Sequence, residues 1–204
     1  MDESKSFVLW FEELLSSLPA LSALTFNHPI CWAIMKICLA RPRIVSLSFS
    51  PRAAFYYQKP FLDQDVATYY SSNIQRFCYN TPLWREAMMS NTRAQRGLGT
   101  IDERYSREAS SMSALVPRMC GSMRELVVPL ETAPLLSMTE VSWPELRSLS
   151  LHGRYRNPSQ VDALPPFLRS LSQMTKLSLL VCRKDAIGRA PILGRHSPAS
   201  ILSG

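Results

Sequence analysis

The chain has 204 residues, enough for one domain with a sizeable core or for a short array of repeats. Its 46% of hydrophobic residues and four tryptophans exclude a disordered chain. The 23 basic residues exceed the 16 acidic ones, but the net charge of +7 is moderate and scattered, so it indicates a solvated basic surface.

The N-terminal residues carry no targeting or membrane signal. "MDESKSFVLWFEELL" lacks the basic start and the long apolar run of a signal peptide. The most apolar window, "ICWAIMKICLA", contains Lys36 and is well short of the roughly 20 residues that span a bilayer. We therefore expect no segment that crosses a membrane.

The chain has five cysteines, an odd number, and no C-x-x-C pair. A disulfide framework or a zinc site is therefore not expected. Cys31 and Cys38 lie seven residues apart, and we interpret both as small buried residues on one side of a helix. Reduced thiols fit a cytoplasmic or nuclear protein.

In chain order, the pattern apolar-x-x-apolar-x-apolar occurs six times, with starts 23, 30, 49, 23 and 28 residues apart. The interval of 49 leaves room for one further degenerate unit or a long insertion. The pattern predicts strands near 23–27, 46–50, 75–79, 125–128, 147–151 and 176–180. The six matches are Leu21-Leu24-Phe26, Ile44-Leu47-Phe49, Ile74-Phe77-Tyr79, Met123-Leu126-Val128, Leu146-Leu149-Leu151 and Met174-Leu177-Leu179.

Chance alone gives this pattern at about one start in ten, so the preceding segments carry more weight. Helical stretches with a following breaker precede four matches: "FVLWFEELLSSLP", "PICWAIMKICLARP", "TAPLLSMTEVSWP" and "LPPFLRSLSQ". A helix followed by a short strand predicts an α/β fold, in which stacked units form a curved parallel sheet with the helices on the opposite side. At the N-terminal end of this array, Phe7, Trp10 and Phe11 are expected to expose apolar surface.

Two stretches interrupt the periodicity. Residues 85–114, rich in arginine, serine and charge, predict a mobile insertion with some helix at its C-terminal end. Residues 183–204 contain several prolines and glycines and predict a poorly ordered tail. The expected organisation is therefore one repeat domain over 1–182, followed by this tail.

These segments resemble leucine-rich repeats, whose units carry L-x-x-L-x-L and run 20–29 residues. The resemblance covers about residues 7–182 and implies an irregular leucine-rich-repeat-like solenoid. The family expects Asn or Cys three residues after each match, and only Cys182 fits. The other five positions are Pro29, Arg52, Pro82, Glu131 and Arg154, so irregular turns are expected.

The phrase "W-P-E-L-R-S-L-S-L" and the irregular spacing resemble the divergent repeats of fungal F-box proteins. In that family an F-box docks on a ubiquitin ligase and the repeats select the substrate. No "L-P-x-E-I-L" helix precedes the first match, so the resemblance covers the repeats without the F-box. It implies a non-enzymatic interaction scaffold whose partner is a protein destined for ubiquitination.

Motifs for catalysis, cofactors and metals were not found. The chain has no Walker, dinucleotide-binding or nucleophile-elbow signature, and its three histidines stand apart from one another. We therefore expect no enzyme, no cofactor and no small-molecule substrate. The alternative is a basic nucleic-acid-binding module, based on net charge and on Arg154, Tyr155 and Arg156 in "HGRYRNP", and we regard it as the weaker hypothesis.

The alternation within the matches predicts the binding surface, because every second side chain of a strand points away from the helices. The first match contributes Ala23, Thr25 and Asn27 to this face. The residues that we expect to contact a protein partner are Arg76, Asn80, Glu125, Ser148, Ser150, His152 and Lys176, with Cys78 and Ser178 between them. Of these, Arg76, Glu125 and Lys176 are expected to set specificity through their charges.

Overall fold

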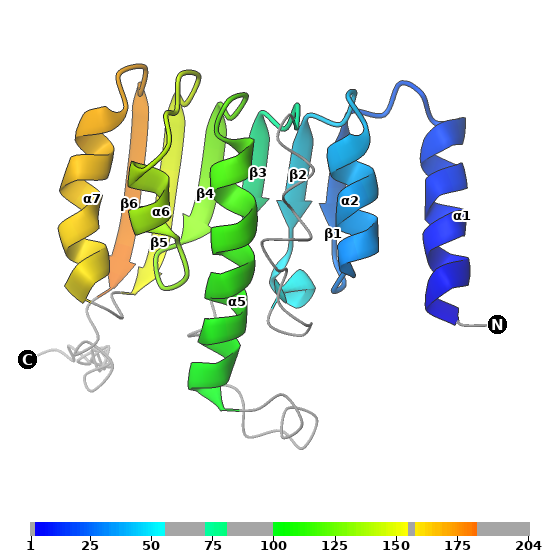
Figure 1. Ribbon diagram of the computed structural model, residues 1–204, viewed down its shortest axis with the longest axis horizontal. Helices are drawn as coiled ribbons and strands as arrows, with labels where there is room; N and C mark the ends of the chain where they lie inside the picture. The colour runs from blue at the N-terminus through cyan, green and yellow to red at the C-terminus, as the bar shows by residue number, and fades with distance from the viewer. Residues whose placement is uncertain (1–2, 56–71, 81–99, 155–157, 183–204) are drawn as a thin grey trace, which may run out of the picture.

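The computed structural model describes residues 3–55, 72–80, 100–154 and 158–182. It is an α/β protein whose six described strands form one all-parallel sheet in chain order (Figure 1). The strands are β1 (Ala23–Phe26), β2 (Ser46–Phe49), β3 (Arg76–Tyr79), β4 (Glu125–Pro129), β5 (Ser148–Arg154) and β6 (Lys176–Cys182). All six expected strands are present, and their parallel pairing is confirmed.

The helices form a layer on one face of the sheet, and α1 lies beyond β1 at the N-terminal end (Figure 1). They are α1 (Glu3–Ser17), α2 (Trp32–Ala40), α5 (Ile101–Leu115), the short α6 (Leu135–Thr139) and α7 (Pro158–Ser170), with 3₁₀ turns η1 (Pro51–Ala53) and η4 (Val116–Met119). Because α2, α5, α6 and α7 return along this face between strands, β2, β4, β5 and β6 can each pair in parallel with the strand before it.

The same turn leads into four of the strands. The backbone amide of the first apolar residue in the apolar-x-x-apolar-x-apolar pattern donates a hydrogen bond to the carbonyl three residues earlier. In the first match, Leu21 donates to Leu18 at 3.0 Å. The other three bonds are Ile44 to Arg41, Leu146 to Trp143 and Met174 to Leu171. Proline explains one of these helix ends: Pro42 forces Arg41 into an extended conformation, so α2 stops before it.

A second repeated feature joins neighbouring strands. In each pair of neighbouring strands, one backbone carbonyl just before the earlier strand accepts hydrogen bonds from two consecutive backbone amides at the start of the later strand. The carbonyl of Ser22 accepts from Val45 and Ser46 at 2.9 and 3.1 Å. The same arrangement uses the carbonyls of Val45, Gln75, Arg124 and Arg147 for the next four strands. All five junctions are therefore alike, although the chain between them varies in length.

The interval of 49 residues places no strand between β3 and β4, since these two strands pair directly. Helix α5 occupies the C-terminal part of the segment that we expected to be an insertion, and residues 81–99 lie outside the described part. Thr100 and Glu103 form a capping box at its start, with bonds of 3.2 and 2.7 Å. A helix at this end was expected, but its close packing was not, because its buried face includes Arg104, Glu108 and Ser111.

Glu108 is fully buried and joins three parts of the fold. Its carboxylate accepts a hydrogen bond from the hydroxyl of Tyr79 at 2.8 Å and another from the hydroxyl of Thr132 at 3.0 Å. The Tyr79 oxygen in turn accepts from the amide of Phe55 at 2.6 Å. Because a buried carboxylate is costly unless it is hydrogen-bonded, this network holds α5 to β3, to the chain after η1 and to the segment after β4.

The expectation for the cysteines is half right. Cys38 is buried in α2, and burial raises the pKa of its thiol to about 12. Cys31 is exposed, because it is the N-cap residue of α2 and lies outside the helix that would have buried it. At the N-terminal end, Phe7 and Trp10 are exposed as expected, whereas Phe11 is buried.

Glycine is required at position 153. Gly153 lies near the end of β5 with a φ of 108°, and a Cβ atom there would overlap the buried carboxylate of Glu131. We predict that Gly153→Ala lowers the free energy of unfolding by about 3 kcal/mol, from backbone strain and overpacking, as measured by urea denaturation. Gly121→Ala is the control, because a Cβ at Gly121 would have nothing within 4 Å. Equal stability of the two variants would contradict this packing.

Candidate interaction surface

The face of the sheet opposite the helices carries the residues expected to bind a partner. Strand register aligns them in rows across the sheet. The first row runs Ala23, Ser46, Arg76, Glu125, Ser148 and Lys176, each paired with the next. The second row runs Thr25, Ser48, Cys78, Val127, Ser150 and Ser178. Four of the expected residues therefore lie side by side on consecutive strands.

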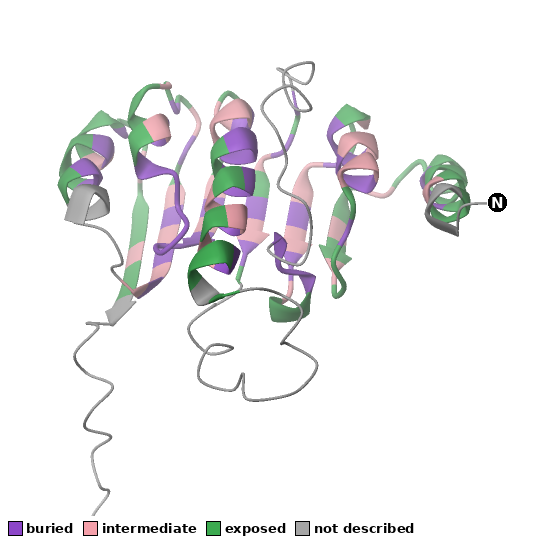
Figure 2. Cartoon of the chain, turned by 60° about the horizontal axis from the view of Figure 1, so that its bottom comes forward, coloured by how far each residue is buried: buried purple, intermediate pink, exposed green. Residues whose placement is uncertain are grey.

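Burial follows the expected alternation along β2, β3, β4 and β5, but not along the edge strand β6, where Leu177 and Leu179 were expected to point inward and are 42% and 45% exposed. In β5 every second residue from Leu149 is buried and those between are half-buried. β2, β3 and β4 show the same alternation, except that Pro129 at the end of β4 is also buried (Figure 2). The inward residues of β2 to β5 pack against the helices and form the core with residues such as Met35, Met112 and Phe167. The outward rows keep access to solvent because no described helix covers them (Figure 1).

The charges of the first row are partly neutralised. Arg76 and Glu125 are register partners, and their side chains form an ion pair at 3.2 Å. Both are substantially exposed, so the pair adds little stability, but it occupies two of the three groups expected to set specificity. Lys176 is exposed on the edge strand and has no ion pair with another described residue.

A third row contains residues that the sequence analysis missed. His152 is register partner to both Pro129 and Leu180. Pro129 is buried, whereas Leu180 is 68% exposed and adds an apolar side chain to this end of the face. Asn80 is exposed and follows β3 directly. Ser46 and Ser48 on β2 were also missed, although the alternation that placed Ser148 and Ser150 would have found them.

Two outward groups have shifted pKa values. Burial is the main cause that raises the pKa of the Cys78 thiol; the charge of Arg76 acts against it and that of Glu125 adds to it. Cys78 is therefore mostly protonated at neutral pH, which makes it a poor nucleophile. Burial also lowers the pKa of His152, whose Nε2 atom is buried without a hydrogen-bond partner among the described residues.

The described residues offer no arrangement for catalysis by a metal. No group of three or more histidine, cysteine, aspartate or glutamate side chains among them is placed to hold an ion. The alternative nucleic-acid site is only partly visible: Arg154 is half-buried at the end of β5, and Tyr155 and Arg156 lie outside the described residues. In the part that the structure describes, no helix is long and apolar enough to cross a bilayer.

Comparison with known proteins adds no assignment. No family model matches the chain, and neither a curated protein nor a solved structure matches it significantly. A role for the strand face in binding a partner is therefore argued from the geometry of that face.

We predict a pH dependence of stability that comes from His152. Because its pKa is lowered in the folded protein, the unfolded chain takes up a proton first when the pH falls below the ordinary value of 6.5. Stability should be complete above this pH and decrease as the pH falls toward the folded pKa. His152→Gln should flatten this part of the curve in urea denaturation between about pH 7 and 5. Ser150→Ala, on the same face, is the control, and an unchanged slope in His152→Gln would contradict the assignment.

Proposed function

We propose that the chain is a non-enzymatic protein–protein interaction scaffold, built as an irregular leucine-rich-repeat-like solenoid with a curved sheet. The observation that carries this proposal is the set of five equivalent strand junctions, each with one carbonyl accepting two amides. Units that repeat the same junction present the same outward positions, so they generate a continuous surface from short segments. The proposal further places the chain with the substrate-recognition repeats of fungal F-box proteins.

The composition of the strand face suits a protein partner. Five of the twelve residues in its first two rows are serine, and the others are Ala23, Thr25, Cys78, Val127, Lys176 and the Arg76–Glu125 ion pair. Small polar side chains let another protein approach closely without making the free surface adhesive. Lys176 and the Arg76–Glu125 pair would then select among partners and set the association rate more than the affinity. In the F-box family such a partner is a substrate for ubiquitination.

The geometry gives little support to a nucleic-acid site. A phosphate-binding face needs several uncompensated cations, and here the arginine of the first row is neutralised by Glu125. Salt titration of any complex distinguishes the two functions, because a complex dominated by phosphate contacts weakens steeply with added salt.

We predict that reversing the charge pattern of the face reduces binding to a protein partner captured with the intact chain. Arg76→Glu alone would set two carboxylates against each other, so the better variant exchanges the pair, Arg76→Glu with Glu125→Arg, and adds Lys176→Glu. This keeps the ion pair across β3 and β4 while reversing its polarity. We expect about tenfold weaker binding, mainly through slower association, measured by surface plasmon resonance.

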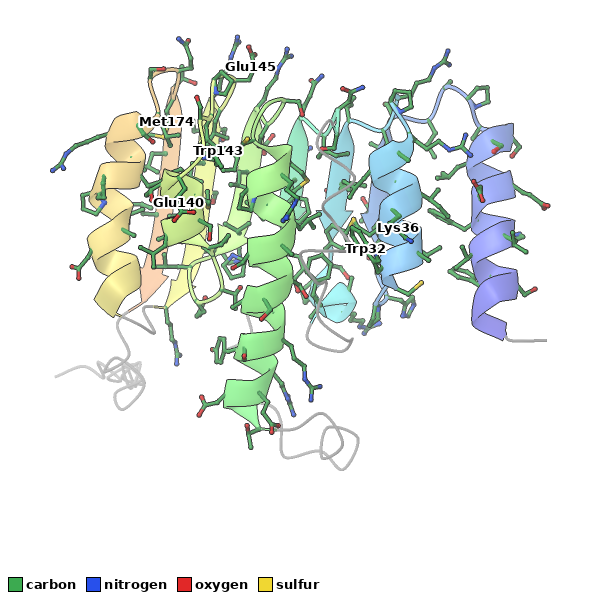
Figure 3. All side chains as sticks on the ribbon, viewed as in Figure 1. Trp32, Lys36, Glu140, Trp143, Glu145 and Met174 are labelled. Carbon is green, nitrogen blue, oxygen red and sulfur yellow. The ribbon has the colours of Figure 1, made fainter. Side chains whose placement is uncertain are left out.

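The matched controls change charge on the helical layer. Lys36 lies on α2, away from the strand face (Figure 3), and Arg169 is exposed on α7. Lys36→Glu and Arg169→Glu, made separately, each change the net charge by as much as the strand-face variant does, and each should leave binding unchanged. Loss of binding in either control, with full binding in the strand-face variant, would move the interaction surface to the helices.

A further inference from the structure

A cavity of about 210 Å³ lies at the N-terminal end of the fold, between the end of α1 and the turn that joins α2 to β2. Its apolar lining includes Leu15 and Ile44, which are 6% and 3% exposed, and Leu18, which is 45% exposed. The strand face lies elsewhere, because the cavity is formed by the ends of helices and the turns that follow them.

Two arginines stand at this apolar cavity. Arg41 donates from Nη2 to the hydroxyl of Ser16 at 2.8 Å, and Arg43 donates from Nη1 to the carbonyl of Pro19 at 2.7 Å. These bonds fix both guanidinium groups and leave other N–H groups of each fork available. Neither arginine forms an ion pair with a described residue, and no carboxylate is among the residues lining the cavity.

The apolar lining and the two arginines together fit a ligand that carries a negative charge next to an apolar group. A carboxylate matches the guanidinium fork, which can hold it with two charge-assisted hydrogen bonds. The cavity is smaller than the roughly 300–1,000 Å³ of sites for drug-sized ligands, so it has room for about one large apolar side chain beside the charge.

The surface beside the cavity indicates what the rest of the ligand is. Leu18 continues a row of exposed apolar side chains along α1 that includes Phe7, Trp10 and Leu14, spaced three or four residues apart. Phe7 and Trp10 stack with their ring centroids 5.6 Å apart. An apolar path leading to a charged cavity fits an extended polypeptide, whose earlier residues would lie on α1 and whose last residue would enter the cavity.

We propose that this cavity binds the C-terminal residue of a partner polypeptide, with an apolar side chain among Leu15, Leu18 and Ile44 and the terminal carboxylate on Arg41 and Arg43. The site is independent of the strand face, so either can fail without the other. Its specificity comes from the free carboxylate, since an amidated terminus cannot form the charged hydrogen bonds.

The test measures the binding of three probes to the intact chain by isothermal titration calorimetry. The first is an N-acetylated pentapeptide that ends in two leucines with a free carboxylate, and the second is the same peptide with an amidated C-terminus. The third is octanoate, which has the charge and an apolar tail but no peptide. We expect the free peptide to bind at least about tenfold more tightly than the amidated one, and octanoate to bind more weakly than the free peptide.

Variants then assign the site. Arg41→Gln with Arg43→Gln should reduce affinity for the free peptide at least about tenfold and leave the weak binding of the amidated peptide unchanged. Arg147→Gln with Arg169→Gln removes two exposed arginines outside the cavity, so it is the charge-matched control and should bind as the unmodified chain does. Three results would each overturn the proposal: equal affinity for the free and the amidated peptide, tighter binding of octanoate than of the free peptide, or no binding of the free peptide. None of these results depends on whether the double variant folds.

Discussion

The structure depends on one constraint: each strand can bury only one of its sides, and neighbouring strands must pair in register for the buried sides to coincide. Leu47, Phe77, Leu126 and Leu149 lie at equivalent positions of four consecutive strands and are fully buried. A shift by one residue in any strand would place its apolar residues on the open face. The paired amides at the five junctions fix this register where each strand begins.

Two acidic side chains are buried in the interior. Glu108 accepts hydrogen bonds from the hydroxyls of Tyr79 and Thr132. Glu131 lies buried against Gly153, where its carboxylate leaves no room for a Cβ atom. Because a buried carboxylate is costly unless it is hydrogen-bonded, the two bonds of Glu108 are needed for α5 to pack at this position.

The strands were predictable because their signal is local. Leu149 and Leu151 lie two residues apart in β5, and the alternation alone assigns both to the inner side. The same rule placed Arg76, Glu125, Ser148 and Lys176 on the open face. The ion pair between Arg76 and Glu125 was missed because it depends on the register of strands separated by 49 residues of chain. The packing of α5 was underestimated because apolar periodicity does not detect a buried face made of Arg104, Glu108 and Ser111.

Along β2 to β5 the strand face is open while the helical side of the same strands is closed. The direct test places single cysteines at four consecutive positions of β5, as Ser148→Cys, Leu149→Cys, Ser150→Cys and Leu151→Cys, and measures alkylation of the folded protein by mass spectrometry. Trypsin releases residues 148–154 as a peptide without native cysteine, so each rate is read separately. We expect fast labelling at positions 148 and 150, which lie on the open face, and strong protection at positions 149 and 151, which are buried. Equal rates at all four positions, or protection at the serine positions, would contradict this expectation.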